Sequence, residues 1–558
     1  MEKLIDLIRQ FDTGDIALPI MQRDYVWQPK KVEALLDSLY RKWPIGIFYL
    51  WHPGQPQPTI GHHLKGESVQ YLLDGQQRLA SLSRAIKNAG GETLLSPPGK
   101  GQREAISWRG FFDVVNEKFV LKGRKKSVER RIENNNPTLI ALSDVMLVND
   151  HISNIEKAVD RLVEGGHIGD TDAEKNEVRK KLHRVASMLD VDVPCQKFDT
   201  TKLKTAEYPT EVEAAIEIFR RLNSGGMSLS AGDVEAARLA QEATYSILGP
   251  MRDFAKGKEC AALGLNFVFL TRALVAIRRG SARFSDLPKS WATATGSPPI
   301  QESWRATQKG LNAAIDLVQG MGWTNRRWLP SANALLPVAY FASLNEGHIA
   351  KEDVREVERF LCLAAWTEAF SGATETAIDH FLTRLEKAGP GSSATVLTDA
   401  IPKAWRWKVK PEDVLNESKT TGTLTQIYLA YLISQDARSW PSDQFLADAS
   451  KIKMTDGSVG SLEVHHIFPR KFIERVKSDI DVNTMGNYAI LTKEDNLAHA
   501  DRDPEVVRQE LTVSQKRNAS VQFIPVEDED ALQVDDYEAF INRRAGEMAS
   551  ALNEFLGL

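Results

Sequence analysis

The sequence predicts a multidomain α+β protein that is mostly helical. Its 558 residues are too many for one hydrophobic core and suggest about three or four domains. Strand-like and helix-like runs alternate in residues 1 to about 90, which predicts an α/β domain. From about 245 to 435 apolar residues recur almost throughout at helical spacing, and this predicts an all-helical middle region.

The composition excludes several classes of protein. Apolar residues make up 42% and charged residues 26%, as in an ordinary soluble globular protein. Apolar stretches fall far short of the roughly 20 residues needed to cross a bilayer, and the first residues lack a signal-peptide layout. The three cysteines, Cys195, Cys260 and Cys362, form no CxxC pair, which argues against disulfides and zinc knuckles. We therefore expect a cytoplasmic protein with no membrane segment.

The net charge of −5 argues against a protein that coats DNA without specificity, so any DNA contact requires a local basic patch. Residues 118–131 supply one candidate, with seven Lys or Arg side chains against one Glu. Two interpretations have equal weight: a surface that contacts phosphates, and a solvated loop. An acidic cluster at 527–538 is expected to face away from a phosphate backbone.

The first domain is predicted to contain two strands and two helices in its first 90 residues. Apolar residues at helical spacing over 32–39 predict a helix that begins near Pro29 and stops before Pro44. The apolar runs 45–51 and 69–73 predict strands.

A turn between the second strand and the following helix is the first candidate binding site. Free N–H groups at a helix start attract anions, and Gly75 lets a ligand approach the backbone closely. Arg78 is a candidate phosphate donor, whereas Asp74 either caps the helix or holds a metal ion. The turn consists of Asp74, Gly75, Gln76, Gln77 and Arg78.

Two adjacent histidines, His465 and His466, close an apolar run that begins at Leu462. A second apolar run starts at Asn487, and Asn496 follows nine residues later. Neighbouring side chains on a strand point to opposite faces, so one imidazole can bind a metal while the other acts as a base. The alternative is that both are ordinary strand histidines. Helices are predicted to follow at about 504–517 and 535–556.

This pattern resembles the HNH, or ββα-metal, nuclease motif. The resemblance makes His465 the first metal ligand, His466 the general base, Asn487 the middle Asn and Asn496 the last ligand. His499 is a candidate for an extra ligand or a phosphate contact. Ligation by one His and one Asn favours Mg²⁺ or Mn²⁺ over structural zinc.

Three stretches, 20–27, 73–79 and 219–230, are similar to the N-terminal domain of GmrSD-type restriction endonucleases. That domain has a ParB-like core that binds and hydrolyses a nucleoside triphosphate (NTP). No Walker P-loop is present, so NTP chemistry must use a different cradle. The resemblance implies a nucleotide pocket lined by Gln22, Arg23, Asp74, Gly75, Gln76, Gln77 and Arg78.

The two resemblances together imply a single-chain Type IV, modification-dependent restriction endonuclease. Its expected parts are an NTP-binding domain at 1–245 with a helical insertion at about 92–210, a helical spacer at 246–435 and a nuclease domain at 436–558. We expect NTP hydrolysis and metal-dependent cleavage of modified double-stranded phage DNA, for example DNA with glucosylated hydroxymethylcytosine. The pattern does not distinguish ATP, GTP, UTP and CTP.

Two rival functions stay open, and a third possibility is that the first domain senses nucleotide and hydrolyses nothing. The first is a defence nickase that senses phosphorothioate in the DNA backbone, and the second is a nucleotide-switched DNA-binding protein that cuts nothing. The two asparagines of the motif argue against the second. Because a nuclease with one site cuts both strands more easily as two copies, we also expect a homodimer.

Overall fold

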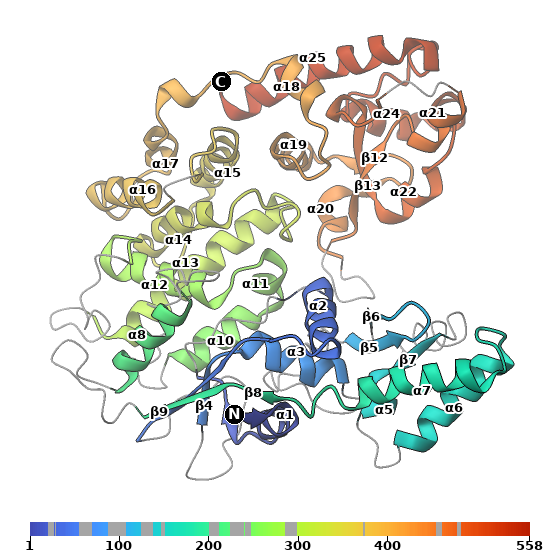
Figure 1. The fold of residues 1–558 in the computed structure, drawn as a ribbon. Coiled ribbons are helices and arrows are strands. Elements are labelled where there is room, and N and C mark those ends of the chain that lie inside the picture. Colours follow the sequence, from blue (N-terminus) through green and yellow to red (C-terminus); the bar gives the residue numbers. More distant parts are fainter. Residues whose placement is uncertain are drawn as a thin grey trace. The chain divides into compact units, whose positions relative to one another are not determined.

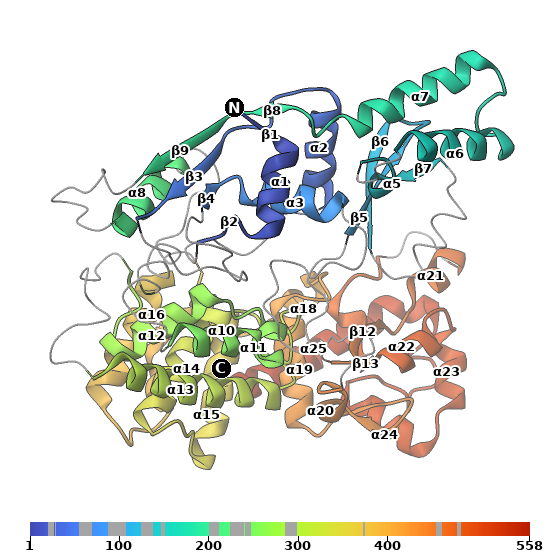
Figure 2. The same ribbon diagram turned by 90° about the horizontal axis from the view of Figure 1, so that it is seen from below.

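The computed structural model describes residues 1–19, 27, 29–54, 70–86, 108–123, 138–146, 151–199, 211–223, 239, 247–284, 298–371, 374–452, 460–476 and 481–558. They form two compact units, Met1–Gln241 and Glu242–Leu558. The chain is shown from two directions in Figure 1 and Figure 2. Small sheets stand among many helices, which confirms the prediction of a mostly helical α+β protein. The finer domain boundaries stay predictions.

The first unit is organised around a four-stranded sheet with the order β2-β4-β3-β9. β4 is parallel to β2 and antiparallel to β3, and β9 is parallel to β3. Buried side chains of helices α1, α2 and α3 join those of the sheet in one apolar core. These elements are β2 (Ile16–Ala17), β3 (Phe48–His52), β4 (Gln70–Asp74), β9 (Cys195–Asp199), α1 (Leu4–Thr13), α2 (Pro29–Tyr40) and α3 (Gln76–Ile86). A short pair, β1 (Glu2–Lys3) and β8 (Asp192–Val193), and helix α8 (Glu211–Asn223) complete the unit.

The segment expected to be a helical insertion also contains a sheet. Its three helices are α5 (Leu142–Met146), α6 (His151–Glu164) and α7 (Asp172–Ala186). The additional three-stranded sheet has the order β6-β5-β7, with β5 at Trp108–Asp113, β6 at Lys118–Gly123 and β7 at Leu139–Ala141. The start of the basic run is thus a strand paired with β5, and not a loop. Residues 124–131 of that run lie outside the described residues.

The second unit begins with a helical region. Among the described residues, those between Leu248 and Ser434 form helices and no strand. Trp304, Trp323 and Trp328 are buried between them. The α-helices are α10 (Leu248–Lys256), α11 (Lys258–Leu263), α12 (Phe267–Arg279), α13 (Ile300–Gly320), α14 (Leu335–Leu344), α15 (Lys351–Trp366), α16 (Thr374–Ala388), α17 (Thr395–Ala400), α18 (Pro411–Asn416) and α19 (Thr423–Ser434).

The carboxyl-terminal part of this unit contains the two apolar runs singled out in the sequence. They form antiparallel strands, β12 (Leu462–His466) and β13 (Tyr488–Thr492), with His466 opposite Tyr488. Helices α22 (Lys493–His499), α23 (Pro504–Glu510), α24 (Val513–Val521) and α25 (Tyr537–Leu556) follow. The smaller elements are β10 (Arg438–Ser439), β11 (Gln444–Phe445), α20 (Leu446–Ala449), α21 (Arg470–Val476) and the 3₁₀ turn η4 (Met485–Asn487). Within the described ranges, no helix combines the length and the apolar character needed to cross a membrane.

Candidate functional site

Two strands and one helix bring the predicted nuclease residues together. Helix α22 begins directly after β13, where the Thr492 hydroxyl caps it by accepting a hydrogen bond from Asp495 N at 3.1 Å. Because no loop intervenes, the helix turns back against β12. Asn496 on α22 therefore meets His465 on β12.

Three polar side chains form a cluster on this face of β12. His465 Nδ1 and Asn496 Oδ1 lie 3.0 Å apart. Asn496 Nδ2 donates to Glu463 Oε2 at 2.8 Å, and this bond fixes the amide so that its oxygen faces the imidazole. Burial lowers the pKa of His465 to about 4, so its ring is neutral near pH 7. The cluster therefore presents an imidazole nitrogen, an amide oxygen and a carboxylate on one face.

Glu463 was not among the residues singled out in the sequence. The sequence could have indicated it, because residues two apart on a strand point to the same face. Glu463 precedes His465 by two residues, so the two side chains share a face of the strand. Only the structure shows that its carboxylate holds the Asn496 amide.

His466 has different surroundings. Its Nε2 lies 3.3 Å from Asn483 Oδ1, and because a carbonyl oxygen only accepts, Nε2 is the donor and Nδ1 keeps a lone pair. The ring meets the Tyr488 ring edge to face, with centroids 5.0 Å apart. Burial lowers the pKa of His466, so a neutral, proton-accepting imidazole is favoured here as well. The imidazole can act as a general base through Nδ1.

Asn487 holds the turn that follows His466. The side chain is fully buried, and its Oδ1 accepts from Phe468 N at 2.9 Å. Its Nδ2 donates to Phe468 O at 3.1 Å and to Val482 O at 3.0 Å. The hydrogen bond to the His466 ring comes from Asn483 instead. Asn487 thus fixes the backbone around the candidate base.

A buried cation supports the backbone on either side of Asn487. Arg544 on α25 is 0% exposed and donates to the carbonyls of Gly486 and Tyr488, which flank Asn487. It also donates to Gln522 O at 2.9 Å and to Phe523 O at 3.1 Å. Burial lowers the pKa of this guanidinium. No local sequence signal identifies Arg544, because its partners are backbone groups distant in the chain.

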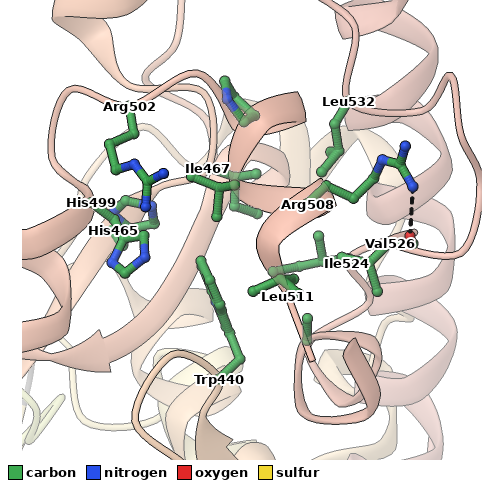
Figure 3. Close-up of a pocket in the computed structure, with 13 residues that line it drawn as sticks. Trp440, His465, Ile467, His499, Arg502, Arg508, Leu511, Ile524, Val526 and Leu532 are labelled. Carbon is green, nitrogen blue, oxygen red and sulfur yellow. Dashed lines mark hydrogen bonds between the residues drawn. The ribbon is translucent and has the colours of Figure 1, made fainter. Parts of the chain in front are cut away.

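His499 lies beside the cluster and lines a small pocket, which Figure 3 shows with His465 and Trp440. Its Nδ1 donates to Asp495 O at 2.9 Å, so Nε2 is the acceptor. Its ring centroid lies 5.2 Å from that of Trp440. In the part of the chain that the structure describes, no three His, Cys, Asp or Glu side chains are placed to hold a metal ion by themselves. An ion here would therefore depend on the Asn496 oxygen and on water.

The predicted nucleotide turn in the first unit joins β4 to α3. Gly75 has φ of +101°, and a Cβ there would collide with the Phe48 ring, so only glycine fits. Arg78 donates to Ile45 O at 2.6 Å, to Ile47 O at 2.8 Å and to Asp74 Oδ2 at 2.9 Å. Its guanidinium therefore ties the loop before β3 to this turn.

The other residues of the predicted nucleotide pocket are placed as follows. Gln76 and Gln77 are buried in the first turn of α3. Gln77 Oε1 accepts from Trp27 N at 3.3 Å, which brings the end of the 20–27 stretch to this turn. Gln22 and Arg23 lie outside the described residues.

Two comparisons relate this chain to known proteins. Residues 2–240 match the family model described as the GmrSD restriction endonuclease, N-terminal domain. The chain is also 24% identical over 422 residues to the uncharacterized protein MJ0686 of Methanocaldococcus jannaschii, across 67% of this chain. It spans 65% of the length of that relative. Residues 2–240 of this chain are therefore similar to the N-terminal domain of GmrSD restriction endonucleases.

Proposed function

We propose that this protein is an NTP-dependent and divalent-metal-dependent endonuclease that cleaves modified foreign DNA through an HNH centre on β12, β13 and α22. The observation that carries the proposal is the 3.0 Å approach of His465 Nδ1 and Asn496 Oδ1, with His466 next in the chain. The GmrSD match in the first unit supports the choice of DNA as substrate.

The donor set suits Mg²⁺ or Mn²⁺. Two adjacent ligands of an octahedral ion with bonds of about 2.1 Å are about 3.0 Å apart, which agrees with the spacing of His465 Nδ1 and Asn496 Oδ1. In this structure His465 Nδ1 donates to Asn496 Oδ1, because an amide oxygen only accepts. Burial keeps the ring neutral, and Nδ1 would ligate an ion in the tautomer that carries the proton on Nε2. Water and phosphate oxygens would complete the shell. A bound divalent ion would stabilise the charge on the leaving oxygen of the phosphodiester.

The chain's own groups supply the proton transfer. His466 takes a proton from the attacking water at Nδ1, while Asn483 holds the opposite ring nitrogen. Asn487 keeps the turn after His466 in place through its three backbone hydrogen bonds. Glu463 keeps the Asn496 oxygen directed at the metal position.

Nucleotide binding is proposed for the turn between β4 and α3. Backbone N–H groups at the start of α3 suit a phosphate. The missing side chain at Gly75 makes room for the Phe48 ring, which packs against the turn. Asp74 stands at the end of β4, paired with Arg78 and with its side chain 40% exposed, and its carboxylate would be the group that holds a nucleotide-bound metal ion. The hydrogen bonds of Arg78 indicate that it also fixes the shape of the turn.

The test is digestion of paired modified and unmodified genomes of one phage, with Mg²⁺ and each of the four NTPs in turn. We expect double-strand cuts in the modified genome only, with at least one NTP. Nicking confined to phosphorothioate plasmids would favour the rival nickase. Binding that leaves every DNA whole would favour the nucleotide-switched binder, and equal cutting of both genomes would contradict modification dependence.

A further inference from the structure

A short segment between α17 and α18 alternates tryptophan with basic residues. Trp405 and Trp407 are 46% and 49% exposed, which is unusual for such large apolar side chains. Lys403 and Lys408 beside them are exposed as well. Aromatic rings interleaved with cations are the combination that binds single-stranded nucleic acid.

The two tryptophans line a pocket of about 590 Å³. This volume falls in the range of pockets that hold small organic ligands, about 300–1,000 Å³. Its walls come from the end of α15, from α16 and from the residues after α17, and Figure 1 shows these three helices together. The lining includes Thr367, Glu368, His380, Phe381, Trp405 and Trp407.

Polar groups enter this pocket at two places. Glu368 is exposed and has φ of +51°, an uncommon backbone conformation for a residue with a side chain. His380 Nε2 donates to Ala400 O at 3.0 Å, which leaves Nδ1 as an acceptor. The pocket thus pairs aromatic surface with a carboxylate and an imidazole acceptor.

Hydrogen bonds to the backbone fix the segment that carries the exposed tryptophans. Trp366 Nε1 donates to Trp407 O at 2.9 Å, and the two indole rings lie 6.1 Å apart. Arg406, which stands between the two exposed tryptophans in sequence, donates to the carbonyls of Ile401 and Thr398. Its cation therefore supports the backbone, and the aromatic surface is pre-formed for a ligand.

We propose that this pocket receives an unpaired base of the DNA substrate, which stacks on Trp405 or Trp407 while Lys403 and Lys408 contact the flanking phosphates. The proposal rests on the proposed function, because DNA is the ligand. Every base has a face for stacking, and a carboxylate such as Glu368 can accept from the exocyclic amino group of cytosine. The pocket would thus examine a base taken out of the duplex, together with a substituent on it.

The same segment is connected to the candidate nuclease centre. Val409 N and O are both bonded to the Asn553 side chain of α25 at 2.8 Å. Thr484 Oγ1 donates to Leu415 O at 2.8 Å, and Tyr488 OH donates to Ser418 O at 2.6 Å. Residues that follow the pocket in the chain are therefore hydrogen-bonded to Thr484 and Tyr488, which lie before and after Asn487.

The test measures binding without cleavage. Labelled oligonucleotides are titrated with the full-length chain in EDTA, and fluorescence polarisation is read for a paired duplex and for the same duplex with one unpaired cytosine. We expect tighter binding of the unpaired form. Replacing both Trp405 and Trp407 by Ala should weaken that form by roughly 5- to 150-fold for one lost stacked base. The paired duplex should change far less.

Matched variants keep the test decisive. Trp43→Ala removes another exposed tryptophan, in the first unit, and should leave the affinity unchanged. Trp405→Phe retains a stacking ring and should preserve most of the affinity, which separates stacking from misfolding. Lys408→Ala should weaken both duplexes and lower the salt slope by about 1.

Equal affinity of the double variant and the parent for the unpaired duplex would overturn the base pocket, as would an equal loss for both duplexes. Because no cutting is measured, failure of this proposal is distinguishable from failure of the nuclease proposal.

Discussion

His465 and Asn496 are 31 positions apart in the sequence, yet Nδ1 of one and Oδ1 of the other lie 3.0 Å apart. The amide is oriented by Glu463 and the imidazole is kept neutral by burial. A hydrogen bond from Nδ1 to Oδ1 joins the two side chains. Their arrangement is what a divalent ion with open coordination positions requires.

Removal of Glu463 should weaken metal binding. In Glu463→Ala the Asn496 amide loses the acceptor that orients it, and loss of such an outer partner typically costs about 10- to 100-fold in metal affinity. Calorimetric titration with Mn²⁺ measures the effect. Glu474→Ala is the matched control, because that carboxylate lies outside the cluster and forms an exposed pair with Arg470. An unchanged Mn²⁺ affinity in Glu463→Ala would show that the carboxylate has no such role.

Replacement of Asn487 should affect both stability and cleavage. Asn487→Ala leaves Phe468 N–H and two buried carbonyls without their partner, and each unpaired group costs about 1–3 kcal/mol. We expect the free energy of unfolding to fall by about 2–5 kcal/mol in chemical denaturation. Cleavage should be lost even where the variant is still folded. If a folded Asn487→Ala variant cleaves DNA at the parent rate, the turn after His466 has no role in cleavage.

The buried guanidinium of Arg544 should be necessary for a competent centre. Arg544→Met removes a donor from four backbone carbonyls, so we expect a loss of about 2–5 kcal/mol in unfolding free energy. At low temperature, where the variant is folded, the cleavage rate should fall more than the DNA affinity. The neighbouring Arg543→Met is the control, because Arg543 is 52% exposed. Equal rates for both variants would contradict the positioning role.

A methyl group at Gly75 should disturb the nucleotide turn. Its φ of +101° disfavours a side chain, and the added Cβ meets the Phe48 ring. We expect Gly75→Ala to lower the stability of the first unit by about 2–4 kcal/mol and to reduce NTP hydrolysis strongly. Gly166→Ala is the comparison, since it also has positive φ but nothing lies near its added Cβ. Phosphate release and thermal melts of both variants would measure the difference, and equal effects would argue against the collision.

The sequence predicted the elements whose signal is local. The runs 45–51 and 69–73 became β3 and β4 with shifts of a few residues, because strands need only a short apolar stretch between turns. The order strand, strand, helix in the sequence predicted that Asn496 returns toward His465. The β5–β6 hairpin was missed because the charges of 118–131 suggested a loop, although Phe119, Val120 and Leu121 form a short apolar run.

The supporting residues could not be predicted in the same way. Arg544 binds carbonyls up to 58 positions away, and no composition or spacing encodes such partners. The exposure of Trp405 and Trp407 depends equally on how Arg406 and Trp366 hold the backbone behind them. The sequence does not predict long-range hydrogen bonds to the main chain. Any residue can supply a carbonyl acceptor, so the side chain at the acceptor position carries no signal.

The cleavage assay with His466→Ala tests the central claim most directly. Modified phage DNA is incubated with Mg²⁺, the activating NTP and either the parent or the variant, and phosphate release is followed in parallel. Because His466 alone supplies the proposed base, the variant should leave the DNA whole while it folds normally and hydrolyses NTP at close to the parent rate. Cleavage by the variant at the parent rate would contradict the assignment of His466, and with it the nuclease centre on β12, β13 and α22.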